Sequence, residues 1–313
     1  MAILSVKNLT KIFIKRSGFK RNKFRSVDDI SFDLEKGEIL GLLGPNGAGK
    51  TTTISMLLST LVPTSGQIYY FGKDFFNNRS SILKNVGFAS AYQSLPQVLT
   101  VDQSLKVFGK LYEVPSKDLN KKIDELLEFF GVPDLKYKST SFLSAGEMTR
   151  VMLAKAFLSD PKIVLLDEPT ASLDPDVAHD VRKFVLYQRE QKGVSFLFTS
   201  HNMSEVTEVC DRVLVLRAGK IIADDTPVGL AQKVHGTKIN LLISENIEKL
   251  VNFLKNKNIL FEHDGNYITI EILENQISWL LKELSDINVN FTEISIDKPS
   301  LEDYFLNVAS RRL

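Results

Sequence analysis

The first part of the chain alternates short apolar segments with turn residues, which predicts β-strands over residues 3–72. The segments are AILSVKNL, ISFDL, EILGLLG and, after one helix, QIYYFG. From about Val101 to Asp160 the apolar residues recur at helical spacing, as in IDELLEFFGV and LSAGEMTRVMLAKAFL. We therefore expect a helical stretch to follow the first strands.

Two continuous apolar segments come next, in PKIVLLDEPT and VSFLFTSH, and a helical stretch from Val177 to Gln191 separates them. Short apolar runs of this kind are typical of strands that are buried on both faces of a parallel sheet. Strands that alternate with helices predict an α/β domain with a mixed, mostly parallel sheet.

Near residue 235 the pattern changes to strand, helix, strand, strand, helix, strand. The segments are KINLLIS, ENIEKLVNFLKNKN, ILFEH, NYITIEIL, ENQISWLLKELSDIN and VNFTEISI, and SLEDYFLNVASRRL adds a last helix. DGN between the middle strands indicates a hairpin. The order is that of ferredoxin-like domains. We predict a domain at residues 1–233 and a small α+β domain at 234–313, regulatory or interfacial rather than catalytic.

The length of the chain agrees with two domains, and its net charge argues against a protein that coats nucleic acid without sequence preference. The 313 residues carry a net charge of only +1, whereas wholesale phosphate neutralisation needs a strongly basic surface. One basic stretch, KRSGFKRNKFR at residues 15–25, is interpreted as a solvated hairpin tip, with a phosphate or lipid-headgroup contact as the alternative. The single cysteine, Cys210, excludes an internal disulfide and fits a reducing compartment.

Hydropathy predicts a soluble chain. The N-terminus, MAILSVKNLTK, lacks the long apolar run of a signal peptide. No stretch approaches the roughly 18 consecutive apolar residues that a membrane span requires. If the chain acts at a membrane, another polypeptide must therefore supply the span.

GPNGAGKT, from Gly44 to Thr51, follows a predicted buried strand and opens a helix, as a phosphate-binding loop does. Gly44, Gly47 and Gly49 allow successive backbone N–H groups to point inward, and the helix adds its positive end. Lys50 can then reach the β- and γ-phosphates, and the Thr51 hydroxyl can bind Mg²⁺. A glycine-rich turn that carries Lys-Thr by chance is the alternative.

Acidic residues and a histidine follow the next predicted strands at their carboxyl ends, where open α/β sheets bind ligands. Asp167 is expected to hold Mg²⁺, and Glu168 to orient or deprotonate an attacking water. His201 ends the strand in SFLFTSH and is predicted to donate a hydrogen bond to a γ-phosphate. Taken alone, two acids at a strand end are more often surface charges, and a lone histidine there is more often a structural residue; their occurrence together with the upstream loop favours the site.

The phosphate loop, LSAGE, IVLLDEP, SLD and TSH occur in the order and spacing of the nucleotide-binding subunits of ATP-binding cassette (ABC) transporters. The chain resembles this family over about residues 3–233. The resemblance implies a P-loop NTPase cassette whose helical signature subdomain covers about residues 95–160. It also implies hydrolysis of ATP with Mg²⁺ to energise a separately encoded membrane permease. PSLEDYFLNV resembles the tail of the export-type branch, so we expect export.

In this family the signature, usually L-S-G-G-Q, caps the γ-phosphate held by a second subunit, and two subunits close head-to-tail around two ATP molecules. Here LSAGE keeps Ser144 and Gly146, while Ala145 and Glu147 depart from the consensus. A helix N-terminus with a serine hydroxyl is a suitable anion site. The resemblance further assigns Asp174, in SLD, to coupling between the two sites.

The resemblance also implies the remaining site residues. The nucleotide contacts are Phe13, which stacks on adenine, and Gly44, Pro45, Asn46, Gly47, Ala48, Gly49, Lys50, Thr51, Thr52, Gln93, Ser144, Gly146, Glu147 and Asp174. The metal ligands are Thr51, Gln93 and Asp167, and the catalytic residues are Glu168, His201 and Lys50. The family's metal-binding glutamine would fall at Ala91 by count, so Gln93 is chosen on the assumption of a longer loop, over Gln97.

Two other functions were considered. A soluble cassette ATPase that acts on nucleic acid or ribosomes usually has two cassettes or a long coiled coil, and only the basic stretch at 15–25 supports it. A regulator that binds nucleotide without hydrolysis is disfavoured because both Glu168 and His201 are present. We expect an ATPase on the cytoplasmic face of the cell membrane, peripherally bound, with a permease and a second copy as partners and no nucleic acid.

Overall fold

The computed structural model describes residues 2–17, 20–91, 93–234 and 236–310. The chain divides into two compact units, Met1–Pro227 and Val228–Leu313. The division falls six residues before the domain boundary that was predicted from the sequence. Each unit has its own hydrophobic core, and each is described separately below.

A six-stranded sheet forms the centre of the first unit. Its strands are, in spatial order, β10 (Lys220–Asp225), β9 (Arg212–Arg217), β3 (Ile39–Leu43), β8 (Ser195–Thr199), β7 (Ile163–Asp167) and β6 (Val86–Ser90). The five strands from β9 to β6 are parallel, and β10 pairs antiparallel with β9. Every residue of β3, β7 and β8 is buried, as expected for strands covered on both faces. The predicted mixed, mostly parallel sheet is thus confirmed.

A second, antiparallel sheet of the first unit consists of β2 (Lys20–Glu35), β1 (Ala2–Ser17), β4 (Ser65–Tyr70) and β5 (Lys73–Asp74). β1 and β2 are much longer than the sequence indicated, because they pair from Ala2 opposite Glu35 to Ser17 opposite Lys20. Much of the basic stretch at 15–25 therefore lies on paired strands. Residues 18–19 and the side chains of 15–21 lie outside the described part of the chain.

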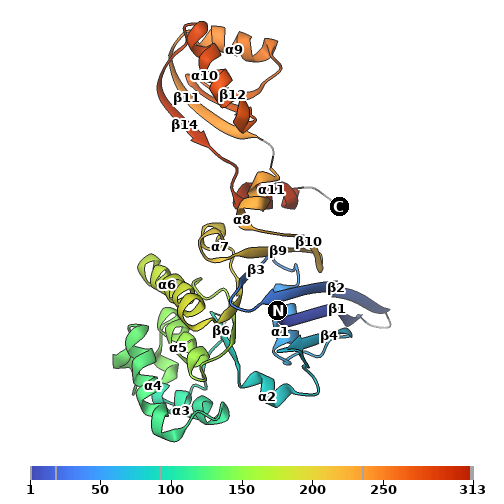
Figure 1. The fold of residues 1–313 in the computed structure, drawn as a ribbon, viewed down its shortest axis with the longest axis vertical. Helices are drawn as coiled ribbons and strands as arrows, with labels where there is room; N and C mark the ends of the chain where they lie inside the picture. The colour runs from blue at the N-terminus through green and yellow to red at the C-terminus, as the bar shows by residue number, and fades with distance from the viewer. Residues whose placement is uncertain (1, 18–19, 92, 235, 311–313) are drawn as a thin grey trace. The chain divides into compact units, whose positions relative to one another are not determined.

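Helices of the first unit fall into two sets. α3 (Val101–Leu111), α4 (Ser116–Phe129) and α5 (Ala145–Phe157) gather on the opposite side of the unit from β1, β2 and β4 (Figure 1). This group is the predicted helical subdomain. The other helices of the first unit are α1 (Lys50–Leu57), α2 (Arg79–Leu83), α6 (Pro175–Lys192) and α7 (Met203–Val209), with 3-10 turns at Pro133–Leu135 and Thr140–Phe142. α8 (Pro227–Gln232) begins at the division and continues into the second unit.

The second unit has the β-α-β-β-α-β order that was predicted. Its elements are β11 (Thr237–Glu245), α9 (Ile247–Asn256), β12 (Leu260–Asp264), β13 (Tyr267–Ile272), a 3-10 turn (Glu274–Gln276), α10 (Ile277–Asp286), β14 (Asn290–Asp297) and α11 (Leu301–Ser310). The sheet is antiparallel in the order β12-β13-β11-β14. Alternate residues of β11, such as Ile239 and Leu241, are buried in one core with Leu250 and Leu280 of the two helices. The ferredoxin-like prediction is thus confirmed.

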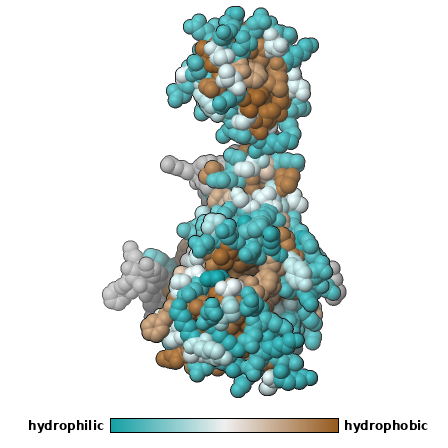
Figure 2. Space-filling model, turned by 90° about the vertical axis from the view of Figure 1, so that its left-hand side faces the viewer, coloured by the Kyte–Doolittle hydropathy of each residue, from teal (hydrophilic) through white to brown (hydrophobic). Residues whose placement is uncertain are grey.

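The face of the molecule drawn in Figure 2 is mostly hydrophilic, and its apolar residues form limited patches. Among the described residues, no helix has both the length and the apolar character that crossing a bilayer requires.

Candidate active site

The predicted phosphate loop connects the end of β3 to the start of α1. Gly49 precedes α1 with φ +110°, and a Cβ at this position would lie 2.5 Å from the carbonyl oxygen of Ser26. Only glycine fits there, because both the conformation and the space exclude a side chain. The loop is closed by the Ala48 N–H, which donates to the Pro45 carbonyl at 3.0 Å, while Asn46 is exposed. The Thr52 hydroxyl lies 2.8 Å from that of Ser26.

Lys50, the first residue of α1, folds back over the loop. Its Nζ donates to the Gly44 carbonyl oxygen at 2.5 Å. Burial lowers the pKa of Lys50, while the nearby carboxylates of Glu168 and Asp167 oppose this shift. The three charged groups that the sequence assigned to nucleotide chemistry are therefore close enough to interact. Thr51, the next residue, is exposed.

Asp167 and Glu168 lie where β7 ends, and Thr199 of the adjacent strand β8 holds both. The Thr199 hydroxyl donates to Asp167 Oδ1 at 2.8 Å and accepts a hydrogen bond from the Glu168 N–H at 3.0 Å. Burial raises the pKa of Asp167, whereas the Thr199 hydrogen bond opposes the rise. Glu168 has φ +55°, which is uncommon for a residue with a side chain and is associated with functional positions.

His201 lies two residues beyond the end of β8 and contacts Glu168. Its ring Nδ1 makes a short hydrogen bond with Glu168 Oε2, and its backbone N–H donates to the same oxygen at 3.3 Å. The Glu168 side chain is 11% exposed, while that of His201 is 70% exposed. The predicted base is thus sheltered, and the predicted phosphate ligand lies between it and solvent.

A buried carboxylate, Glu205 on α7, fixes the segments that follow both strands, and sequence reasoning missed it. Its Oε2 accepts hydrogen bonds from the Thr170 hydroxyl at 2.7 Å and the Ser200 hydroxyl at 2.9 Å. Its Oε1 lies 3.2 Å from the Arg182 guanidinium. Glu205 therefore sets the spacing between Glu168 and His201. No local pattern marks it, because two of its partners, Thr170 and Arg182, lie 35 and 23 positions away in the sequence.

The signature segment begins α5 with a capping box. The Ser144 hydroxyl accepts from the Glu147 N–H at 3.2 Å, and the Ser144 N–H donates to Glu147 Oε2 at 2.7 Å. The hydrogen bond from the Ser144 N–H lowers the pKa of Glu147. The ammonium group of Lys138, 3.2 Å from the carboxylate, lowers the same pKa further. The sequence already shows this role in the pattern S-x-x-E. A Cβ at Gly146 would lie 3.1 Å from the Ser172 carbonyl oxygen, so the signature packs against the segment that leads to Asp174.

The other predicted contacts lie on exposed positions. Asp174 precedes α6 and is exposed. Phe13 on β1 is 40% exposed, with Lys11 Nζ 5.3 Å from its ring centre. Gln93 is exposed three residues beyond β6, whereas the N–H of Ala91 donates to the Asp167 carbonyl at 3.3 Å. The position that the family count indicates is thus next to Asp167, and the metal role of Gln93 stays a prediction.

Comparison with known proteins agrees with this site. The family described as ABC transporter matches residues 27–171. The bacitracin transport ATP-binding protein BcrA of Bacillus licheniformis is 30% identical over 308 residues, which cover 98% of this chain and 97% of the relative. The linearmycin resistance ATP-binding protein LnrL of Bacillus subtilis is 30% identical, with 99% of both chains covered. The Nod factor export ATP-binding protein I of Neorhizobium galegae is 31% identical, with 92% of this chain and 81% of the relative covered.

Solved structures show the same fold. A nucleotide-free ATP-binding cassette from an ABC transporter is 29% identical with a TM-score of 0.57, over 72% of this chain and 91% of that one. A post-hydrolysis dimer of an ATP-binding cassette bound to ADP and Pi is 20% identical with a TM-score of 0.64, and the match covers 71% of this chain and 98% of that one. The chain therefore belongs to the ABC transporter family, as an ATP-binding subunit whose ATP hydrolysis is coupled to transport.

Proposed function

We propose that two copies of this chain close head-to-tail around two ATP molecules and drive a separately encoded membrane permease in the direction of export. The main support is the gathering of Lys50, Asp167, Glu168 and His201 at the ends of three adjacent parallel strands. This cluster contains a cation, two carboxylates and a ring N–H, which are the groups that phosphoryl transfer to water needs.

The second copy would bring a phosphate to the start of the signature helix, where backbone N–H groups and a serine hydroxyl suit an anion. In the described part of the chain, the Ser144 hydroxyl accepts a hydrogen bond from the Glu147 N–H, and the Ser144 N–H donates to the Glu147 carboxylate. The start of α5 still presents the positive end of the helix and an exposed serine. In a head-to-tail pair, Ser144 and Gly146 of one copy would contact the γ-phosphate that the other copy holds at Lys50.

The residues around the phosphate loop fit Mg²⁺. Asp167 offers a carboxylate fixed by Thr199, and Thr51 offers an exposed hydroxyl on the first turn of α1. Oxygen ligands of this kind suit a hard divalent cation. When bound, the ion would neutralise charge that develops on the phosphate. Gln93 is the third proposed ligand.

Each catalytic residue then has a distinct role. Glu168 accepts a proton from the attacking water, and its burial and its contact with His201 hold it in place. His201, which is exposed, turns its ring toward the γ-phosphate when nucleotide binds. Lys50 leaves the Gly44 carbonyl to contact the β- and γ-phosphates. Phe13 stacks on the adenine ring, and Asp174 couples the two sites.

Export is the direction that the relatives favour. Their names refer to bacitracin transport, linearmycin resistance and Nod factor export. Since no described helix can span a bilayer, the permease would supply the membrane path. The chain would then be peripheral, at the cytoplasmic face of the membrane.

A variant that binds ATP but hydrolyses it slowly tests whether the head-to-tail dimer forms. We expect Glu168→Gln to lower ATP turnover by about 10²–10⁴-fold, because the base is lost while the ligands remain. With MgATP, this variant should elute as a dimer in size-exclusion chromatography with light scattering. Adding Ser144→Arg should return it to a monomer, since the bulky side chain blocks the anion site.

Ser116→Arg in the same Glu168→Gln background is the matched control, because Ser116 is exposed and also begins a helix of the subdomain, α4. It should leave the dimer intact. Undiminished turnover in Glu168→Gln would remove Glu168 as the base. A strict monomer with MgATP, or a dimer that tolerates Ser144→Arg, would refute the head-to-tail arrangement.

A further inference from the structure

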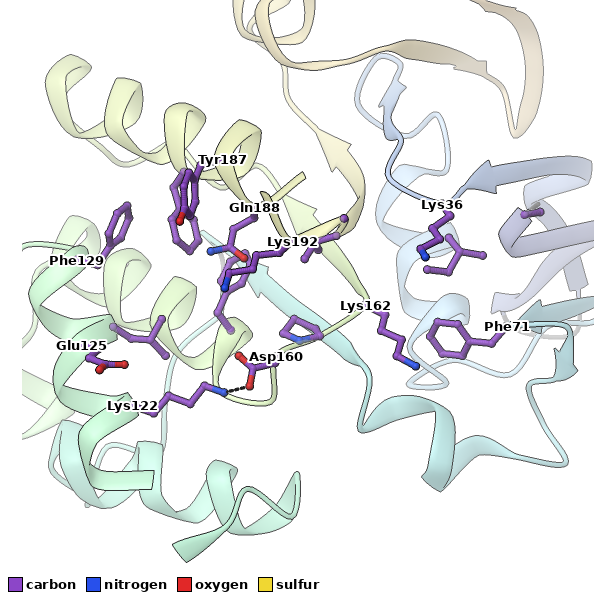
Figure 3. A pocket seen from close by; sticks show the side chains of 18 residues that line it. Lys36, Phe71, Lys122, Glu125, Phe129, Asp160, Lys162, Tyr187, Gln188 and Lys192 are labelled. Carbon is purple, nitrogen blue, oxygen red and sulfur yellow. Dashed lines mark hydrogen bonds and ion pairs between the residues drawn. The ribbon is translucent and has the colours of Figure 1, made fainter. Parts of the chain in front are cut away.

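A cavity of about 1000 Å³ lies in the first unit, away from the nucleotide site (Figure 3). It opens at the amino ends of the parallel strands, where Lys162 precedes β7 and Val194 precedes β8. Asp167 and Thr199 lie at the other ends of the same two strands. No residue of the phosphate loop, and none of Glu168, His201 and Ser144, lines the cavity.

Aromatic rings from three helices make its apolar wall. Phe129 of α4 and Tyr187 of α6 are 52% and 53% exposed. Behind them, the ring centroid of Phe184 lies 4.4 Å from that of Phe129 and 4.7 Å from that of Phe157 on α5. Covering such rings with an apolar group removes apolar surface from water, which contributes a favourable free energy of about 25 cal/mol per Å². The wall therefore favours a ligand with an apolar body.

The charges around the cavity are unbalanced. Lys122 is neutralised by an ion pair with Asp160. Three further lysines, Lys36, Lys162 and Lys192, line the cavity without an ion pair among the described residues. Figure 3 shows Lys36 and Lys162 on one side of the cavity and Lys192 on the other. Lys162 Nζ lies 5.8 Å from the centre of the Phe71 ring, so a cation stands beside an apolar surface.

The other acidic residue of the cavity does not balance these lysines. Glu125 lies 3.5 Å from Lys121, which is outside the cavity. The free charge that faces a ligand is therefore positive. A ligand that complements both features has a negative head group and an apolar body.

We propose that this cavity binds a small anionic amphiphile, whose apolar body packs against Phe129 and Tyr187 and whose carboxylate or similar head group pairs with Lys36 and Lys162, on the same side of the cavity. The volume matches the upper range of small-molecule pockets in proteins. Lining from α4, α5, α6 and the strand ends encloses such a molecule on several sides, whereas a protein segment would need an extended groove.

Dansylaminoundecanoate is a suitable probe, because it combines an acyl chain, an aromatic ring and one carboxylate. Titrated against the full chain, it should show a saturable rise in fluorescence with one site per chain. Its neutral methyl ester should bind about fivefold more weakly or worse, since it cannot pair with the lysines. Saturating MgATP should not displace the probe, because the two sites lie at opposite ends of the strands.

Lysine variants locate the probe. Lys36→Gln and Lys162→Gln should each weaken binding by about two- to fivefold while keeping the apolar stem. Lys117→Gln is the matched control, since Lys117 is an exposed lysine of α4 that does not line the cavity. The proposal is overturned if the ester binds as tightly as the acid, if both cavity variants match the wild type, if MgATP displaces the probe, or if no saturable binding occurs.

Discussion

Lys155 is a lysine inside the protein without a carboxylate partner among the described residues. It lies on α5 and is only 5% exposed, with Nζ 5.2 Å from the ring centre of Phe108 and 5.8 Å from that of Phe88. Burial lowers its pKa from 10.5 to about 8. The ammonium group thus joins α3, α5 and β6 through two aromatic faces rather than through an ion pair.

The sign of the pH effect follows from this lowered pKa. Between about pH 8 and 10.5 the unfolded chain holds a proton on Lys155 that the folded chain has released, so this group makes stability rise with pH. Below pH 8 the lysine is charged in both states. There the free-energy cost of its burial is present in full, at most about 3 kcal/mol, and the two rings offset part of it.

Replacing Lys155 by Met should therefore stabilise the protein near neutral pH. We expect Lys155→Met to melt at a higher temperature than the wild type at pH 7, and the difference to shrink toward pH 10. Thermal melts of both proteins across this range measure it. Lys110→Met, at an exposed lysine of α3, should show no such pH-dependent difference. A difference that stays constant or grows with pH would contradict the assignment to Lys155.

Short residue patterns predicted those parts of the site that one continuous segment of the chain forms by itself. Glycines at fixed spacing define a phosphate loop because backbone conformation sets its geometry, and Gly49 has no room for a side chain. Thr199 and Glu205 could not be found this way. Their roles depend on β7 and β8 being neighbours in the sheet, which places residues over thirty positions apart in hydrogen-bonding contact. Lys155 was missed for the same reason, since only the fold shows what covers it.

At the scale of elements, α5 shows how one residue can serve a helix and a site together. Glu147 caps the helix through the Ser144 N–H and also pairs with Lys138. Its lowered pKa means that this contribution is present above about pH 4.5 and is lost as the pH falls through the lowered value. The departure from the glutamine of the family signature therefore keeps the capping geometry and adds an ion pair.

Substitutions at Glu147 separate the cap from the charge. Glu147→Ala should cost about 1 kcal/mol of stability, because the Ser144 N–H loses its acceptor at the start of α5. Glu147→Gln should cost less than about 0.5 kcal/mol, because an amide oxygen can accept the same hydrogen bond. Denaturant unfolding of the two variants and the wild type compares them. Equal losses in both variants would show that the charge, not the cap, matters.

Sequence patterns predicted elements well where one pattern continues for several turns or residues. Periodicity indicated α4 and α6, although α6 begins at Pro175, two residues before the predicted start. α2 and α7, with five and seven residues, are too short for periodicity to mark them. β1 and β2 extend beyond the apolar pattern because each supplies backbone partners to the other along the hairpin. Pairing between strands cannot be inferred from one strand alone.

At the scale of the whole molecule, the two units have separate cores. The core of the first unit packs residues such as Leu40, Tyr70 and Leu165, and that of the second packs Ile239, Ile268 and Leu280. Units with separate cores can unfold independently. The only tryptophan of the sequence, Trp279, lies on α10 in the second unit. Its fluorescence therefore reports that unit, whereas calorimetry reports both.

We expect two calorimetric transitions, and MgATP should raise only the one that does not coincide with the Trp279 melt. The Glu168→Gln variant is used so that the nucleotide persists. At an MgATP concentration of about a hundred times Kd, binding adds about 2.7 kcal/mol to the free energy of unfolding of the first unit. This corresponds to a rise of about 5–10 °C in the melting temperature for a unit of this size. Adding Lys50→Ala should abolish the rise, because the loop loses its phosphate contact. If the Trp279 midpoint rises equally with MgATP, or if a single transition is seen, the two units unfold as one and the prediction is wrong.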